Sequence, residues 1–248
     1  MYLSRITLAP VREAYRILGD IHALHRLVMR GFPPAVGEPA RAAYGVLFRV
    51  ELTGPQQPVP VLVQSAVEPQ WPRELPAGVQ EIAGPRSLEG LLQRLVPGER
   101  FRFRLRANPT RRVHARATGE ADAGRGRLRP EQEAACGKRV AVHGEERRLA
   151  WLARQGEQHG FRVVTVRLEQ AQVPNVAIVG QVRGEYWVGA KREDQGARHR
   201  IVLDTVLYEG VLEVTGAEAL RQAVTRGIGP GKAFGCGLLS LAPLRPAG

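Results

Sequence analysis

Two histidines near the N-terminus are the residues of this sequence best suited to chemistry. The segment "DIHALHRLVMRGFP", residues 20–33, places His22 and His25 three residues apart, so a helix would present both imidazoles on one face. Both would lie in the first two turns, where the positive end of the helix dipole favours the neutral imidazole. A neutral imidazole can act as a general base near pH 7. Arg26, one turn after His22, could add a positive charge.

Other interpretations of the two histidines stay open. They also fit solvated side chains on an exposed helix face. A metal site is less favoured, because no cysteine or carboxylate cluster nearby supplies a third ligand.

A glycine-rich segment near the C-terminus is the second candidate. "GIGPGKAFGCGLLSLAPL", residues 227–244, holds five glycines in eleven positions with Lys232 among them. It is not a Walker A loop, because the first glycine and the final Ser or Thr of that motif are missing. The bare backbone at Gly229 and Gly231, with Lys232 as a point charge, would suit a phosphate-bearing ligand. The alternative is a merely flexible turn.

The overall charge points to a polyanionic partner. The chain has 36 Lys and Arg against 24 Asp and Glu, a net charge of +12, which favours nucleic acid over an inert basic surface. No apolar run is long enough to span a membrane, so no membrane partner is expected. Cys136 and Cys236 make neither a disulfide framework nor a zinc cluster, and a cytoplasmic location is expected.

The pattern of expected elements repeats along the chain. In the first half we expect strands at 2–8, 45–52 and 59–67 and helices beginning at Asp20 and at 87–95. In the second half we expect a helix at 145–160, strands at 161–169 and 201–214, a helix at 216–226 with a Thr215–Glu218 capping box, and a closing strand. Two such units predict an α+β protein of two tandem ferredoxin-like (RRM-like, βαββαβ) domains with antiparallel sheets, at 1–95 and 96–248.

An arginine-rich strand is expected at the start of the second unit. In "GERFRFRLRANP", residues 98–109, apolar side chains alternate with arginines, so the arginines share one face. That face is either solvated or a track for phosphates, and its candidate RNA contacts are Arg102, Arg104 and Arg106.

A basic hairpin loop is expected at "KREDQGARHR", residues 191–200. It is either a solvated loop or a finger for a nucleic-acid groove. Its candidate contacts are Lys191, Arg192, Arg198 and Arg200.

RNA offers a route to cleavage that needs few protein groups. Its 2′-OH can attack the adjacent phosphate, so the protein need supply only a base, an acid and a cationic clamp. No paired-acid signature of two-metal cleavage stands out in the sequence.

Taken together, these motifs resemble the CasE family, the CRISPR-associated endoribonuclease of type I-E systems. The elements that carry the resemblance are "MYLSRITLA", "DIHALHRLVMRGFP", "VLVQSA", "FRFRLRANP", "AWLARQ", "LYEGVLEV" and the glycine-rich segment. It implies tandem RRM-like domains and metal-independent cleavage of the CRISPR precursor RNA at the base of the repeat stem-loop, without a cofactor. It also implies that the product is kept and that the enzyme joins other Cascade subunits.

The resemblance also implies roles for particular residues. The family's catalytic histidine falls on His25, and His22 stands where the family often has a tyrosine. The hairpin that enters the RNA groove in relatives falls on about 186–201. The glycine-rich segment becomes a cradle for the RNA backbone.

Two other functions remain in view. One is a non-catalytic RNA-binding subunit of a CRISPR ribonucleoprotein. The other is a general single-strand binder, which is disfavoured because three Trp, five Tyr and six Phe form no aromatic run for base stacking.

Overall fold

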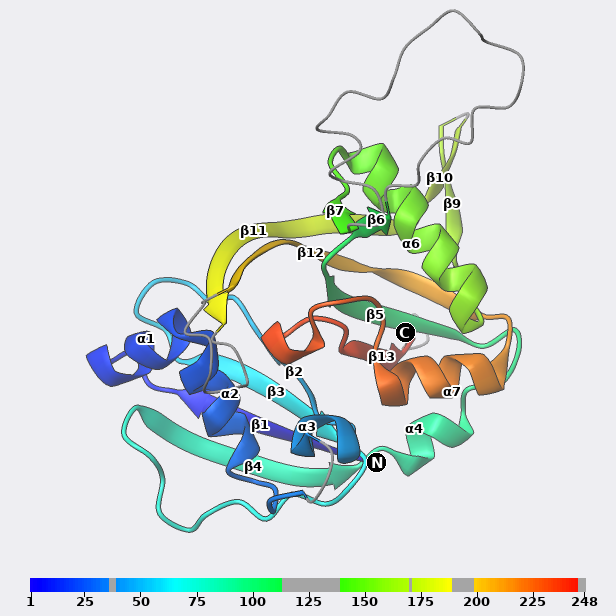
Figure 1. Cartoon of the computed structure of the whole chain (residues 1–248). Helices are drawn as coiled ribbons and strands as arrows, with labels where there is room; N and C mark the ends of the chain where they lie inside the picture. The colour runs from blue at the N-terminus through cyan, green and yellow to red at the C-terminus, as the bar shows by residue number, and fades with distance from the viewer. Residues whose placement is uncertain (36–38, 113–138, 170, 189–198, 245–248) are drawn as a thin grey trace, which may run out of the picture.

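The computed structural model describes residues 1–35, 39–112, 139–169, 171–188 and 199–244 (Figure 1). The two main sheets divide the chain between them. The first is built from strands before residue 88 and the second from strands after residue 99. None of the described helices is long and apolar enough to cross a membrane.

The first sheet is antiparallel and has the strand order β2-β3-β1-β4. Its strands are β1 (Tyr2–Leu8), β2 (Leu47–Val50), β3 (Val59–Ser65) and β4 (Val79–Ser87). Between β1 and β2 the chain forms α1 (Arg12–Gly19), α2 (Ile21–Met29) and α3 (Ala40–Ala43). Leu24 and Val28 of α2 pack with Ile6 and Phe48 in one core cluster. The sheet and this cluster hold α2, which carries both histidines, in a fixed place.

The first unit departs from the expected order in three ways. A fourth strand, β4, was missed, and the predicted helix at 87–95 is the shorter α4 (Glu89–Gln93), which follows β4 instead of preceding it. The strand lies at the sheet edge and only Val79 is buried, so its sequence shows no alternation to recognise. The helix α1 was also missed.

The second sheet has the two expected helices but one strand more than the βαββαβ order. Its strands are β5 (Arg100–Ala107), β8 (Phe161–Val163), β11 (Val176–Val188), β12 (His199–Val214) and β13 (Leu239–Pro243), and its helices are α6 (Glu145–His159) and α7 (Ala217–Arg226). The strand order is β11-β12-β5-β13, with β8 beside the end of β12. In both sheets the unit's first strand is central: β1 lies between β3 and β4, and β5 lies between β12 and β13, as in a ferredoxin-like sheet.

Smaller features of the second unit differ from the prediction. The expected strand at 161–169 is divided into β8 and β9 (Thr165–Leu168), and β9 pairs with β10 (Ala171–Pro174). A further short pair joins β6 (Thr110–Arg112) and β7 (Arg139–Ala141). The capping box was wrong, because α7 begins after Gly216 and has no side-chain cap. The end of α6 at Gly160, with φ +72°, was predicted correctly.

The helix α4 packs on the second core, not the first. Leu91 and Leu92 contact the cluster that includes Leu95 and Phe101, and Arg221 of α7 donates to the carbonyl oxygens of Leu92 and Leu95 at 3.1 Å each. The division into domains at 95/96 therefore stays a prediction, with the packing favouring a boundary before α4.

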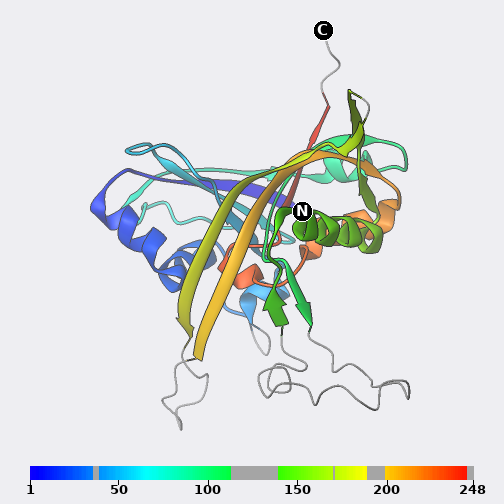
Figure 2. The same ribbon diagram turned by 90° about the horizontal axis from the view of Figure 1, so that it is seen from above.

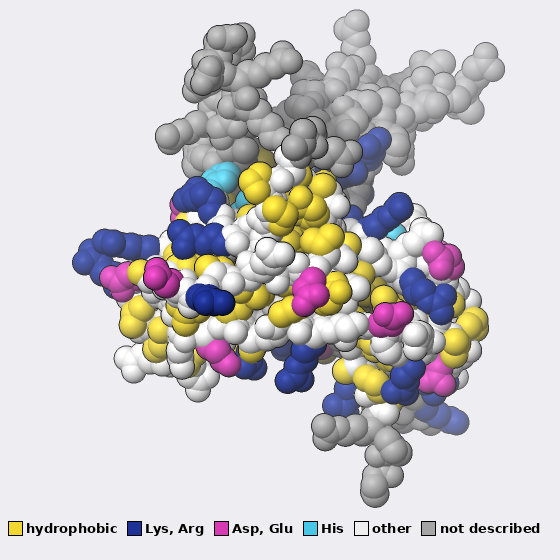
Figure 3. Space-filling view, turned by 90° about the horizontal axis from the view of Figure 1, so that it is seen from below, with side chains coloured by type: hydrophobic (Ala, Val, Ile, Leu, Met, Phe, Trp, Pro, Cys, Tyr) yellow, Lys and Arg dark blue, Asp and Glu magenta, His cyan; other side chains and the backbone are white. Residues whose placement is uncertain are grey.

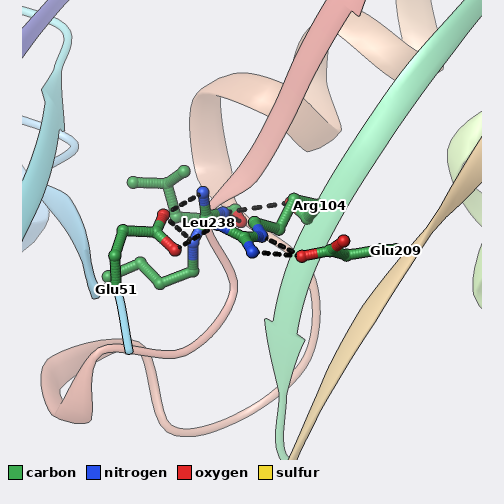
Figure 4. A network of polar contacts seen from close by, with 5 residues as sticks. Glu51, Arg104, Glu209 and Leu238 are labelled. Atoms are coloured by element: carbon green, nitrogen blue, oxygen red, sulfur yellow. Dashed lines mark hydrogen bonds and ion pairs between the residues drawn. The ribbon is translucent and has the colours of Figure 1, made fainter. Parts of the chain in front are cut away.

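A buried arginine joins the two sheets. Arg49 of β2 is 1% exposed, and its Nε donates to Glu51 Oε1 at 2.8 Å. Its Nη1 donates to the backbone oxygens of Arg104 and Leu238 at 3.0 and 3.1 Å. Figure 4 shows Glu51 reaching Arg104 as well, and Arg104 continuing to Glu209 of β12. Because a buried charge must be paired to be tolerated, this network fixes how the two sheets meet.

Candidate nucleic-acid interface

The helix α2 holds His22 and His25 as the sequence predicted. The Asp20 carboxylate accepts the backbone N–H of His22 at 2.9 Å and caps the helix. Leu24, Leu27 and Val28 face the core, and the two histidines lie on the neighbouring face of the helix. His22 is exposed, whereas His25 is half-buried with its ring centroid 6.5 Å from that of Phe48.

The surroundings of His25 favour the neutral form of its imidazole. Burial lowers the pKa of His25 below its usual value, and the positive charges of Arg41, His22 and Arg26 lower it further. Within the described chain, its Nδ1 is buried without a hydrogen-bond partner. Nε2 is therefore the ring nitrogen left to contact a substrate. In the neutral ring with the proton on Nδ1, Nε2 can accept a proton.

The glycine-rich segment is a hydrogen-bonded turn, which argues against a merely flexible one. Ile228 N–H donates to Gly237 O at 2.9 Å, and Gly237 N–H donates to Arg106 O at 2.7 Å. All five glycines have positive φ. At Gly227 an added Cβ would also lie 2.9 Å from Leu47 Cδ2. The glycines are therefore explained by backbone shape and close packing, and their contacts with RNA stay a prediction.

This turn lies against the wall of the His25 site. An added Cβ on Gly235 would lie 3.3 Å from the ring of Phe48, the same ring that faces His25. The short 3-10 helix η1 (Lys232–Phe234) packs near both α2 and β2. The two segments singled out from opposite ends of the sequence therefore meet in the structure.

Arg41 is a further cation of this site, and sequence reasoning missed it. Its Nη1 donates to Val46 O at 3.2 Å, two residues before Phe48. Burial lowers the pKa of Lys232, and the charges of Arg41 and Arg226 lower it further. Arg41 therefore lies close enough to act electrostatically on both His25 and Lys232. Its four-residue helix α3 shows no periodic pattern that could have singled it out.

The arginine strand is not a uniform set of free cations. The alternation is confirmed, because the four apolar side chains of β5 are buried. Arg100 pairs with Glu213 at 3.0 Å, and Arg104 pairs with Glu51 and Glu209. Arg102 is exposed and has no partner in the described residues. Contacts of Arg102, Arg104 and Arg106 with RNA stay predictions, and Arg104 is already held between the two sheets.

The basic hairpin lies largely outside the described residues. Lys191, Arg192 and Arg198 are not described, while Arg200 lies in β12. Figures 1 and 2 both show that the β11–β12 pair lies beside α2 at the end where β11 stops and β12 begins. The strands that carry the predicted hairpin therefore end on the side of the molecule that holds His25.

The charge of the described surface is not spread evenly. On the face in Figure 3, Lys and Arg side chains are interspersed with Asp and Glu around hydrophobic side chains. That face offers no continuous basic surface within the part of the chain that is described. The convergence of His25, Arg41 and Lys232 is therefore a better guide to the interface than net charge.

Cys236 offers no reactive thiol at this site. Cys236 is buried, and burial raises its pKa to about 12, so this thiol packs rather than reacts. No group of three or more His, Cys, Asp or Glu side chains in the described residues could hold a metal ion.

Comparisons with known proteins place this chain in a family. The chain is 35% identical over 244 residues to "CRISPR-associated endoribonuclease Cse3" of Thermus thermophilus, and this covers 98% of the chain and all of that protein. It is 31% identical over 247 residues to "CRISPR system Cascade subunit CasE" of Escherichia coli, with 98% and 100% covered. A solved structure, Thermus thermophilus Cse3 bound to an RNA representing a pre-cleavage complex, matches with a TM-score of 0.70 at 33% identity over 98% of both chains. A family model described as "CRISPR associated protein" matches residues 1–243, and the chain therefore belongs to that CRISPR-associated family.

Proposed function

We propose that this protein is a cytoplasmic endoribonuclease that cleaves CRISPR precursor RNA at the base of the repeat stem-loop and keeps the product as a Cascade subunit. The observation that carries the proposal is the half-buried His25 on α2, which packs near the η1 turn that holds Lys232, with Arg41 acting electrostatically on both residues. The relatives support the substrate and the assembly, since one is named an endoribonuclease and the other a Cascade subunit.

The reaction that fits these groups starts from the RNA itself. His25 Nε2 takes the proton of the 2′-OH, and the resulting oxygen attacks the adjacent phosphorus. The bond to the 5′-oxygen breaks, and that oxygen receives a proton from an acid, for which His22 is the candidate. The Arg41 and Lys232 cations stabilise the extra negative charge on the phosphate in the transition state.

The direct test is cleavage of the cognate repeat RNA in excess EDTA. We expect one cut at the base of the stem-loop, at the same rate as in magnesium, because the described groups supply a base and cations without a metal. Denaturing gel electrophoresis of end-labelled RNA measures both site and rate. Tight binding without any cut would instead indicate the non-catalytic subunit.

The rate should also depend on pH in a specific way. Because burial and nearby cations lower the pKa of His25, the base stays neutral and active below pH 6.5. We expect the acid limb of kcat/KM, which reports the free enzyme, to lie below pH 6.5. Arg41→Gln should move that limb upward, but only in part, since burial is the larger cause.

A matched variant controls for loss of charge. Arg154→Gln removes an exposed arginine from α6, away from this site, and should leave the limb in place. An acid limb that is the same in Arg41→Gln and in the wild type would show that Arg41 does not act on the base.

A further inference from the structure

A hollow on the second domain has no role in the proposed reaction. It measures about 300 Å³, which is at the lower end of the range for ligand sites. It lies where the β6–β7 pair meets α6 and the start of the glycine-rich turn. Its lining includes Thr110, Arg112, Arg139, Trp151, Gln155 and Gly229. We call it the Arg112–Arg139 hollow.

Two arginines stand at this hollow in an unfavourable arrangement. Arg112 and Arg139 are direct partners across the antiparallel β6–β7 pair, and both are exposed. Like charges directly opposite each other destabilise a pair of strands. Neither guanidinium has a hydrogen bond or an ion pair with any described residue. An anion bound between them would offset the repulsion and satisfy both donors.

The inner wall of the hollow is rigid. Trp151 is 4% exposed, and its ring stacks on Tyr208 with centroids 6.3 Å apart and planes 12° from parallel. Gly229 has φ +75°, and an added Cβ there would lie 3.2 Å from the Trp151 ring. The turn therefore closes on Trp151 only because it has no side chain at this position. The half-buried Gln155 adds an amide to the same wall.

The hollow is connected to the His25 site by the glycine-rich turn. Gly229 precedes Lys232 by three residues, a span of at most about 11 Å. Burial lowers the pKa of His159, which lies one turn after Gln155 on α6, and the charge of Lys232 lowers it further. Lys232 therefore acts electrostatically on both sides, toward Arg41 and toward the helix that lines the hollow.

We propose that the Arg112–Arg139 hollow binds a backbone phosphate of the RNA strand that runs from the His25 site over the glycine-rich turn. The inference rests on the proposed function, because it takes the ligand to be the RNA that His25 cleaves. The two guanidinium groups hold the phosphate, and the Trp151 wall and the Gly229 backbone limit how deep it sits. The site extends the RNA path onto the second domain without reading the base sequence.

The test is RNA binding as a function of salt. Arg112→Gln/Arg139→Gln should bind a non-cleavable repeat RNA, with 2′-deoxy at the cut, about tenfold more weakly. The slope of log K against log salt should fall by about 0.7 to 0.9, because the variant neutralises one phosphate fewer and releases correspondingly fewer counterions. Arg112→Lys/Arg139→Lys should keep most of the slope, because the charge remains.

A matched pair controls for the loss of two charges. Arg111 lies on the same strand but does not line the hollow, and Arg154 lies on α6 outside it. Arg111→Gln/Arg154→Gln should bind within about twofold of the wild type, with an unchanged slope. Equal losses in the two double variants would overturn the proposal, since only general charge would then matter.

Trimming the RNA locates the contact. With flanking nucleotides removed one at a time, wild-type affinity should drop at one step, and the hollow variant should show no drop at that step. Additive losses would contradict a shared contact. Inorganic phosphate is the probe for a free-anion site: millimolar phosphate that binds the wild type but not the variant, without displacing the RNA, would replace the RNA assignment.

The two proposals fail in different ways. Binding is measured on RNA that cannot be cut, so it does not depend on His25 chemistry. If the wild type cleaves repeat RNA but the hollow variant binds like the control pair, only the hollow assignment is wrong. If the wild type does not cleave repeat RNA, the proposed function itself is wrong.

Discussion

Replacing His25 with alanine is expected to slow single-turnover cleavage of the repeat RNA by about 10² to 10⁴. The loss falls on the chemical step, because the imidazole is the group placed to take the proton of the 2′-OH. Binding of the RNA hairpin should stay within a few-fold, since the cations Arg41 and Lys232 remain. Rates at saturating protein, together with affinities for non-cleavable RNA, separate the two effects.

The structure makes this variant easier to interpret than most. Within the described chain the buried Nδ1 of His25 has no hydrogen-bond partner, so removing the ring leaves no described polar group newly unpaired. His22→Ala is the internal comparison, because the same helix loses an imidazole that is exposed. We expect a smaller loss there, and substantial activity in His22→Tyr. Wild-type speed in His25→Ala would remove His25 from the mechanism.

Local patterns explain what the sequence allowed us to predict. The alternation in β5 was clear because each apolar side chain faces the core and each arginine faces away. The start of α2 was clear because Asp20 is a side-chain cap, and the end of α6 because Gly160 adopts a left-handed conformation. Each of these signals lies within a few residues and depends on backbone geometry alone.

What was missed depends on contacts between distant segments. Nothing near Arg41 in sequence shows that it lies by His25 and Lys232, which requires α2, α3 and the C-terminal turn to meet. The sequence predicts that Arg104 is one of several free arginines on a strand face. In the structure it pairs with Glu51, which directly follows β2 of the other sheet. The cross-strand pairing of Arg112 with Arg139 joins residues 27 positions apart that no local pattern connects.

The buried network at Arg49 gives these distant contacts a common cause. Arg49 bonds to the backbone of both β5 and the segment leading into β13, so the glycine-rich turn is held relative to β2. Phe48, the next residue toward the N-terminus, faces His25 and lies against Gly235. The arrangement of base and cations therefore depends on how the two sheets are joined as much as on α2 itself.

Replacing the 2′-OH just upstream of the cut with hydrogen is expected to abolish cleavage. In the proposed reaction that hydroxyl is the nucleophile, so a deoxy substrate has no group that can attack the phosphorus.

The products of normal cleavage should be a 2′,3′-cyclic phosphate or 3′-phosphate upstream and a 5′-OH downstream, whereas a two-metal route activates water and usually leaves a 3′-OH and a 5′-phosphate. The deoxy RNA should still bind, because one hydroxyl is a small part of an interface that reads phosphates and hairpin shape over many nucleotides. Mass spectrometry of the product ends, alongside affinity for the deoxy RNA, checks both statements. Cleavage of the deoxy substrate, or a 5′-phosphate on the downstream product, would overturn the 2′-OH mechanism while leaving the family assignment intact.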